Sequence, residues 1–418
     1  MGERQGSDPA RSTYPRRVNR RLLAVVAAVA LTAGCANASS GVVVISSPSS
    51  TAAATPVSSM PPVPDPTGTL RPKETFLTVG VADDLPGGVY LPQAPDGGTD
   101  DYRCFLADPK LVKDGSVTGV QFLPGNPDVV HHSILFRVEP SQVSAALKKD
   151  AADPRPGWEC FGGPGLPSTS KNPLDGLDAA PWLAGWAPGG KESVFGAGFG
   201  VPMPAGSQIV VQMHYNLRRA GTGQVQDNTH IRLRVSSDRS LAPLSTMLLP
   251  APVEVPCPSG VTGPLCDRGA SLADVTSRFG PGSGRTVAGL QLLCGGDLFK
   301  PKAGLTQSCV RYVREPVTIR AAAGHMHLLG HSIRIVANAG TPRERLVIDI
   351  PVWNFDDQSA VQLAKPVPLK TGDTVTVTCT HDPTLRDKLP ELKGTQPRYI
   401  VWGEGTTDEM CLGILITS

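Results

Sequence analysis

The sequence predicts an all-β fold built from antiparallel β-sandwich domains, and three observations support this. The chain has 418 residues with 45 Gly and 41 Pro, a composition typical of strands joined by tight turns. Short runs of alternating or β-branched apolar residues recur along most of its length. Only Gln142–Asp150 has a convincing helical pattern. A net charge of +2, with 18% charged residues, gives no electrostatic footprint for nucleic acid, so we expect no such partner.

The first 35 residues are expected to be an export signal that takes no part in the fold. A basic region with Arg16, Arg17, Arg20 and Arg21 precedes an apolar run, Leu22–Leu31, that is too short to span a bilayer as a helix. Leu31–Cys35 (LTAGC) is similar to a bacterial lipobox, whose cysteine becomes the lipidated first residue; ordinary signal cleavage nearby is the alternative. We therefore expect an exported protein, held at the outer face of the cell membrane by a lipid on Cys35.

Residues 36–72 are expected to form a disordered tether, because they are rich in Ser, Ala, Pro and Thr and cannot bury a core. The folded body is expected to start at residue 73, and the Pro-rich passage Leu241–Pro258 divides it into domains 73–240 and 241–418. The expected strands are Thr118–Leu123, Ser133–Val138, Gln208–His214, His230–Val235, Val317–Ala321, Ser332–Val336, Leu346–Pro351 and Thr374–Thr380.

Eight cysteines remain when Cys35 is set aside, and an even number in an exported chain indicates four disulfides. They are Cys104, Cys160, Cys257, Cys266, Cys294, Cys309, Cys379 and Cys411. Eight cysteines allow about 105 pairings, so the number alone does not settle the partners. None lies in a C-x-x-C pair, so we do not expect a thiolate zinc site.

The chain has eight histidines, and five of them lie in or beside apolar, strand-like runs. On a strand, His325 and His327 would share a face and could bind one metal ion. The neighbours His131 and His132 would point to opposite faces unless the strand is twisted, bulged or ending there. His214 is an inward-facing candidate by alternation. Taken alone, each of these motifs is more often a core or surface histidine than a metal ligand.

Imidazole binds zinc, copper, iron and nickel, so the histidines do not choose the metal. Met410 comes directly before an apolar run, where most methionines are core residues. If its thioether joined His325 and His327, a site of two nitrogens and one sulfur would favour copper cycling between its two oxidation states.

Five fragments, taken in order, resemble the type II ascorbate-dependent copper monooxygenases, a family that includes peptidylglycine α-hydroxylating monooxygenase and dopamine β-monooxygenase. The fragments are Asp101–Cys104, Val130–Phe136, Gln212–Tyr215, His325–Gly330 and Asp408–Cys411. They span nearly the whole exported body, in the order and rough spacing of the family.

The resemblance implies two antiparallel, jelly-roll-like β-sandwich domains that face each other across a solvent-filled cleft. It implies two copper ions per chain. The electron-transfer copper would be bound by His131, His132 and His214. The O₂-binding, catalytic copper would be bound by His325, His327 and Met410, with a Cys379–Cys411 disulfide bracing the methionine. Gln212 lies two residues before His214 and could orient a ligand or a bridging water; ordinary surface polarity is the alternative.

The chain also departs from the family pattern. The position of an arginine that holds the substrate carboxylate in the peptide-hydroxylating enzyme is Ala323 here, and Arg320 lies five residues before His325. Two further positions, which are Asn and Tyr in the peptide-hydroxylating enzyme, are the apolar residues Leu412 and Ile414 here. Peptidylglycine is therefore not expected as the substrate, and a more apolar or quite different molecule is favoured. The cysteines depart from the animal pattern too, and we expect the pairs Cys104–Cys160, Cys257–Cys266 and Cys294–Cys309.

The expected function is a lipid-anchored, monomeric copper monooxygenase that hydroxylates a C–H bond of an organic substrate. It would use O₂ and an external one-electron donor such as ascorbate. The alternative is a non-catalytic lipoprotein that binds or buffers copper on the same fold. A zinc hydrolase is a third possibility, but no H-E-x-x-H motif supplies a positioned glutamate. The resemblance gives no ligand role to His230, His331 or His381, and for His331 we expect a structural or cleft-edge role.

Overall fold

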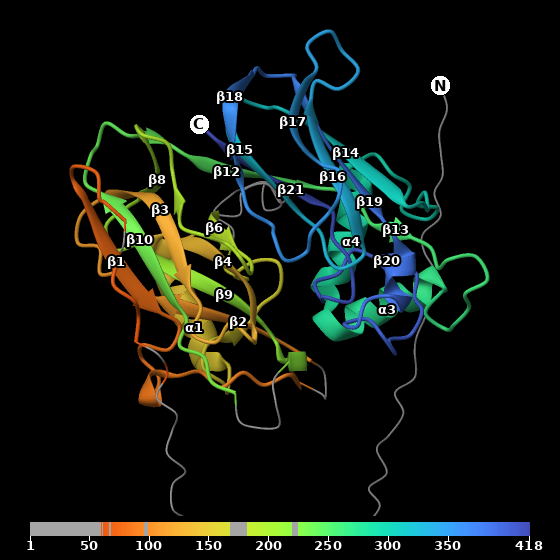
Figure 1. Ribbon diagram of the computed structural model, residues 1–418, viewed down its shortest axis with the longest axis horizontal. Helices are drawn as coiled ribbons and strands as arrows, with labels where there is room; N and C mark the ends of the chain where they lie inside the picture. The colour runs from red at the N-terminus through yellow and green to blue at the C-terminus, as the bar shows by residue number, and fades with distance from the viewer. Residues whose placement is uncertain (1–59, 61, 67, 96–98, 168–181, 220–224) are drawn as a thin grey trace, which may run out of the picture. The chain divides into compact units, whose positions relative to one another are not determined.

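The computed structural model describes residues 60, 62–66, 68–95, 99–167, 182–219 and 225–418 (Figure 1). The expected export signal, Cys35 and most of the tether lie outside the described residues. The described chain is mostly β, with several antiparallel sheets. Within these residues, no helix has the length and apolar character needed to cross a membrane.

Two sheets are formed by strands that precede residue 244. The first sheet contains β1 (Glu74–Gly80), β10 (His230–Ser236), β3 (Gly115–Leu123), β8 (Phe199–Met203) and β11 (Ala242–Pro243), with β7 (Ser193–Val194) paired to β3. The second contains β5 (Trp158–Glu159), β2 (Asp100–Ala107), β9 (Gln208–Asn216), β4 (Val130–Val138) and β6 (Trp182–Trp186). Both sheets bury side chains in one apolar cluster, to which Val120 and Leu233 contribute from the first and Leu135 and Val211 from the second.

The remaining sheets are formed by strands that follow residue 244 (Figure 1). One contains β12 (Ser245–Pro250), β21 (Leu412–Thr417), β15 (Val317–His325) and β18 (Val361–Leu369). Another contains β14 (Thr306–Tyr312), β19 (Thr374–His381), β16 (Gly330–Ala337) and β17 (Arg345–Ile350), and β13 (Glu254–Val255) pairs with β20 (Ile400–Val401). Their apolar cluster also includes Phe136 and Val210 from the earlier strands, so the two halves of the chain share buried surface.

All eight expected strands are present, most of them longer than the alternating run that predicted them. β19 shows why the pattern was informative: Val375, Val377 and Cys379 are fully buried, while the threonines between them are partly exposed. Alternation puts successive side chains on opposite faces of the sheet, and here one face packs against the core.

The expectation of a single helix is wrong. α1 (Val143–Ala152) matches the expected segment, but α3 (Arg268–Phe279) and α4 (Pro281–Leu293) are also present, with short 3₁₀ turns at Pro86–Gly88, Pro140–Gln142, Leu217–Arg219 and Pro383–Asp387. The many glycines between residues 268 and 293 lower the intrinsic helix propensity. Burial of Val275, Val287 and Leu290 stabilises the two helices despite this, and Asp267 caps α3 by accepting a hydrogen bond from the amide of Ala270.

Four disulfides join the eight cysteines in the expected pairs: Cys104–Cys160, Cys257–Cys266, Cys294–Cys309 and Cys379–Cys411. Cys104 lies on β2, and Cys379 on β19 is joined to the residue that precedes β21. Two of the bridges therefore fasten strands that carry or adjoin the candidate ligands. Four disulfides also fit an exported protein.

Candidate metal centre

The β4–β9 strand pair brings three of the candidate histidines together. Val130 pairs with Tyr215 and His132 pairs with His214, so His131 is an extra residue on β4 and the register shifts at this point. A β-bulge of this kind re-aims side chains that would otherwise point to opposite faces. The irregularity that the two adjacent histidines need in order to face one site is therefore present.

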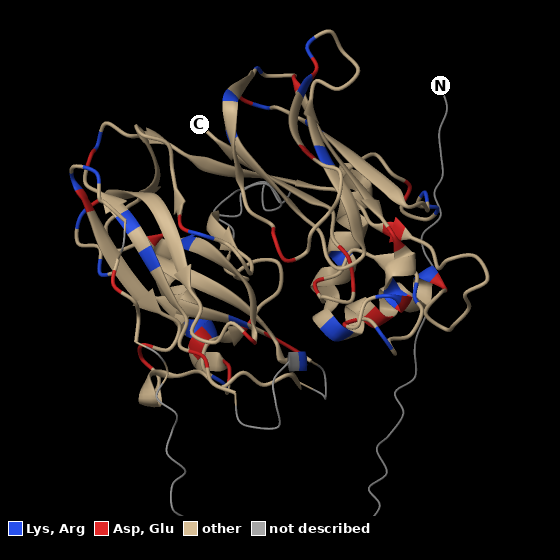
Figure 2. Ribbon diagram, viewed as in Figure 1, with Lys and Arg blue, Asp and Glu red and all other residues tan. Residues whose placement is uncertain are grey.

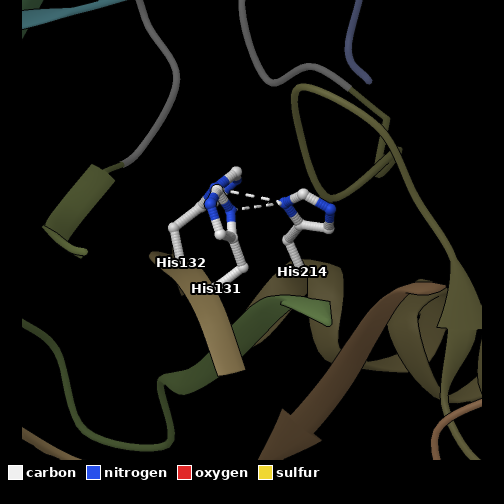
Figure 3. A group of neighbouring side chains, drawn as sticks. All are labelled: His131, His132 and His214. Atoms are coloured by element: carbon white, nitrogen blue, oxygen red, sulfur yellow. Dashed lines mark hydrogen bonds between the residues drawn. The ribbon is translucent and has the colours of Figure 1, made fainter. Parts of the chain in front are cut away.

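The three imidazoles direct their Nδ1 atoms toward one another (Figure 3). Nδ1 of His131 lies 3.3 Å from Nδ1 of His132 and 3.1 Å from Nδ1 of His214, and the last two are 3.3 Å apart. In the plane of the three nitrogen atoms, the point equidistant from them is about 1.9 Å from each, close to the ~2.0–2.1 Å of a metal–imidazole bond. Three facing ring nitrogens cannot all satisfy one another by hydrogen bonding, whereas a single cation would satisfy all three. The donor set therefore fits a metal ion.

His214 is oriented from its other side by Asp100. Nε2 of His214 lies 2.7 Å from Oδ1 of Asp100. Burial alone raises the pKa of Asp100, but the hydrogen bond from His214 lowers it to about 2, so the carboxylate stays ionised. An ionised acceptor keeps the proton on Nε2, which leaves the Nδ1 lone pair of His214 for a metal.

The other two rings are held as neutral imidazoles. Removal from water, followed by the proximity of His214, lowers the pKa of both His131 and His132 well below the ordinary value. Neutral imidazole is the form that binds a metal ion. Tyr102 stacks on His214 with ring centroids 4.1 Å apart and donates a hydrogen bond from its hydroxyl to the carbonyl of Glu404 at 2.8 Å.

His325 and His327 form a second group, although not on one strand. β15 ends at His325, so the expectation that both histidines lie on a strand is wrong; their ring centroids are nevertheless 5.2 Å apart. Nδ1 of His325 lies 2.7 Å from Oε1 of Gln358, and Nδ1 of His327 lies 3.3 Å from the carbonyl oxygen of Asp408. Both partners are acceptors, so they keep the proton on Nδ1 and leave the two Nε2 atoms as candidate ligands.

A fully buried carboxylate, Glu409, explains why the chain turns after His325. It accepts hydrogen bonds from the backbone amide of His327 at 3.0 Å and from that of Leu329 at 2.6 Å. Nε2 of His381 lies 3.5 Å from the same carboxylate. Burial alone raises the pKa of Glu409, but the hydrogen bond and charge of His381 bring it below the ordinary value. The ionised carboxylate thus supplies the hydrogen-bond acceptors that a neighbouring strand would otherwise offer to the backbone amides of His327 and Leu329.

Met410 follows Glu409 directly and is 7% exposed. On β21, Leu412 pairs with His325, so Met410 lies two residues before the position opposite that histidine. Its backbone is anchored by the Cys379–Cys411 bridge and by a 3.3 Å contact between its carbonyl oxygen and Nε2 of His381. Ligation by the thioether remains a prediction, but the segment that carries it is firmly held beside the second histidine group.

Helix α3 supports the same segment through a salt-bridge network. Arg278 donates to the two carboxylate oxygens of Asp408 at 2.6 and 2.9 Å, and Arg398 contacts Asp408 at 3.2 Å and Asp274 at 2.8 Å. Figure 2 shows basic and acidic segments side by side around α3. Because the carbonyl of Asp408 is also the acceptor for His327, this network helps to fix that imidazole.

The two histidine groups adjoin each other. The ring centroids of His132 and His325 are 5.9 Å apart. Phe355, in the connection between β17 and β18, stacks on His131 with centroids 4.8 Å apart, and Gln358 from the same connection contacts His325. This arrangement leaves no wide gap between the groups, in contrast to the solvent-filled cleft that the resemblance implies.

The other residues singled out in the sequence lie outside the two groups or behind them. Gln212 is 3% exposed, which excludes a surface role, and its amide nitrogen lies 3.5 Å from Sγ of Cys160. His230 lies 3.4 Å from a carboxylate oxygen of Asp83, and His331 is exposed. His381 has the structural role described above, beside Glu409.

Sequence reasoning gave no role to Asp100, Gln358, Glu409 or Phe355. Glu409 had a signal, because it is the charged residue directly before the apolar run that begins at Met410. The signal for Asp100 was weaker: it is the first of two adjacent acidic residues at the start of a mostly apolar run. Nothing local marks Gln358 or Phe355, since their partners are far away in the sequence.

Comparison of the chain with protein-family models gives no match, and comparison with curated proteins gives none. Among solved structures, the chain is similar to allantoicase at 12% identity and a TM-score of 0.17, over 76% of this chain and 81% of that one. It is similar to the coconut allergen cocosin at 10% identity and a TM-score of 0.15, over 79% and 81% of the two chains. Similarities at this level carry no argument about fold or function, so the candidate site stands on its own geometry.

Proposed function

We propose that the protein is an exported copper-dependent monooxygenase that hydroxylates a C–H bond of a small, largely apolar organic substrate. It would use O₂ and an external one-electron donor. The observation that carries this proposal is the presence of two unlike histidine groups. One presents three converging Nδ1 atoms, and the other leaves two Nε2 atoms beside a segment that ends in a methionine.

His131, His132 and His214 would hold one copper ion, and His325, His327 and Met410 would hold the other. Imidazoles alone do not distinguish copper from zinc or nickel, but a thioether ligand favours copper. When bound, copper supplies the one-electron redox chemistry and O₂ activation that no amino-acid side chain offers. The different donor sets support different roles for the two groups.

The residues around the ligands hold protons and fix ring orientations. Asp100 keeps a proton on Nε2 of His214, and Gln358 keeps one on Nδ1 of His325. Glu409 fixes the turn that presents His327 by binding two backbone amides. Such partners set the tautomer and basicity of a ligand, and losing one typically weakens metal binding by about 10–100-fold.

The strands beside His325 favour an apolar substrate. Ala323 pairs with Ile414 and His325 pairs with Leu412, so these three apolar residues flank the second histidine group. They offer no charged or hydrogen-bonding side chain to a substrate carboxylate. Their contribution is to exclude water and to receive an apolar body.

We further propose that the sheets form two β-sandwich domains, residues 73–240 and 241–418, each contributing one histidine group. The apolar cluster shared by the sheets of β3 and β9 supports the first sandwich. The four disulfides fit export, and we propose that Cys35 carries the lipid that holds the protein at the membrane.

The test is copper content and substrate-dependent O₂ uptake with ascorbate as the electron donor. The native protein should bind two copper ions per chain. His325→Ala should lose one of them and nearly all turnover, whereas His230→Ala, at a histidine paired with Asp83, should keep both. Uptake that survives His325→Ala would refute the proposal.

The second candidate function is a copper-binding protein without turnover. The apolar residues Ala323, Leu412 and Ile414 favour it, because they replace polar residues of the peptide-hydroxylating enzyme. It predicts two bound copper ions and no reductant-driven turnover. Hydroxylation of any C–H substrate that depends on Met410 would rule it out.

A further inference from the structure

A recess lies away from the histidine groups, where β8, β15, β18 and β21 come together. Its volume is about 290 Å³, just below the ~300–1,000 Å³ of typical small-ligand sites, so it suits a small occupant. Its apolar lining comes from Phe195, Phe199, Leu244, Leu363 and Ile416. These residues come from both halves of the chain, so an occupant would contact both.

Arg320 is the one charged residue among those that line the recess. Its guanidinium carbon lies 3.8 Å from the centroid of the Phe199 ring, and its Nε donates to Oγ of Ser418. Within the described part of the chain, Arg320 has no carboxylate partner, and its two terminal nitrogens make no hydrogen bond. Stacking and the Nε hydrogen bond hold the guanidinium in place, and its outer edge is a fork that matches a planar oxyanion.

We propose that this recess binds a small monocarboxylate with an apolar alkyl or aryl body. The carboxylate would pair with the terminal nitrogens of Arg320, and the body would lie against Phe195 and Leu363. Arg320 and His325 are five residues apart on β15, about 16 Å along a strand. The site is therefore separate from the metal centre, and the inference does not depend on the proposed function.

The test is isothermal titration calorimetry of the purified full chain with three probes. 3-Phenylpropionate has both the charge and the apolar body, 3-phenylpropanol lacks the charge, and acetate lacks the body. The proposal requires measurable binding of 3-phenylpropionate that is at least about tenfold tighter than that of either other probe, because a hydrogen bond to a charged group is worth ~1.5–3 kcal/mol.

Two variants locate the site. Arg320→Gln should weaken binding of 3-phenylpropionate by about 10–100-fold. Ala364 lines the recess and is exposed, so Ala364→Trp should block it with Arg320 intact and little effect on folding. Arg334→Gln removes an exposed arginine on another sheet and should change nothing. If Arg320→Gln fails to fold, Ala364→Trp still decides the question.

Three results would overturn the inference: absence of 3-phenylpropionate binding, equal binding of the acid and the alcohol, or undiminished binding to Ala364→Trp. None of them bears on the copper content, so failure here is distinguishable from failure of the proposed function.

Discussion

Glu404 and Glu409 lie on the same segment, Glu409 fully buried and Glu404 partly buried, yet replacement by glutamine should change the stability in opposite directions. Glu409 accepts hydrogen bonds from the backbone amides of His327 and Leu329 and lies beside His381. Glutamine has nearly the same shape but only one acceptor oxygen. In Glu409→Gln, one buried amide would therefore face an NH₂ group instead of an oxygen.

The expected cost follows from the hydrogen bonds that are lost. A hydrogen bond to a charged group is worth ~1.5–3 kcal/mol, and a buried donor left without a partner costs a similar amount. We expect Glu409→Gln to lower the free energy of unfolding by about 2–4 kcal/mol. Unfolding entropy grows with chain length, so for a folded body of roughly 350 residues each kcal/mol corresponds to ~1–2 °C, and the melting temperature should fall by about 2–8 °C.

Glu404→Gln is the matched comparison. Burial, augmented by the negative charge of Asp408, raises the pKa of Glu404 from 4.5 to about 7. Its folded state therefore binds more protons than its unfolded state between these values, and stability falls as the pH rises through this window. Ionisation of Glu404 lowers the free energy of unfolding by at most about 3 kcal/mol. This loss is complete above pH 7 and absent below pH 4.5. Glu404→Gln should thus be more stable than the native protein at pH 8 and equal to it at pH 4.5.

The assay is thermal unfolding of metal-free protein, followed by circular dichroism at pH 8 and again near pH 4.5. Metal-free protein is used so that a change in stability reports on the turn that Glu409 holds and not on weaker binding of a metal ion. Native-like stability of Glu409→Gln at pH 8 would refute the role of this carboxylate in holding the His327 turn. A loss of stability in Glu404→Gln at pH 8 would show that its carboxylate is stabilised where the structure predicts a penalty.

Two further predictions concern the groups behind the ligands. Asp100→Asn should weaken copper binding by the three-histidine group by about 10–100-fold, measured by competition with a copper chelator, and should leave the group of His325 unchanged; equal weakening at both groups would contradict this. Replacing Cys379 and Cys411 with serine opens a bridge with a sequence separation of 32 and should cost about 3–4 kcal/mol in urea unfolding. Unchanged stability of that double variant would mean that neighbouring contacts already fix the Met410 segment.

Local patterns predicted most of the strands because burial on one face repeats every second residue. β19 is an example, because Val375, Val377 and Cys379 are fully buried and the threonines between them are partly exposed. Helices α3 and α4 were not predicted, because their glycines weaken the local signal and their stability comes from packing against distant residues. The four disulfide pairs were predicted correctly, although the sequence offers many alternatives.

The candidate site, like the fold, has features that the sequence predicted and others that depend on contacts between distant strands. The family resemblance, rather than any single motif, predicted a metal at His131, His132 and His214, and the adjacency of the first two showed that a bulge would be needed. The position of that bulge depends on the register between β4 and β9, which a local pattern does not encode. The partnership of Asp100 with His214 likewise depends on two strands that are far apart in sequence.

The end of β15 at His325 was also beyond sequence reasoning, because it is set by Glu409, more than eighty residues away. Alternation predicted one strand through His325 and His327. A buried carboxylate that binds two amides instead makes a turn, and it still brings the two imidazoles together.

The central claim is that one chain carries two copper sites with different donor atoms. Copper content and X-ray absorption of the Cu(I) form, for the native protein and for Met410→Ala, test it most directly. We predict two copper ions per native chain and a sulfur scatterer that disappears in Met410→Ala while the nitrogen scattering of the three-histidine group remains. A single copper ion, zinc in place of copper, or a sulfur signal that persists without Met410 would contradict the account.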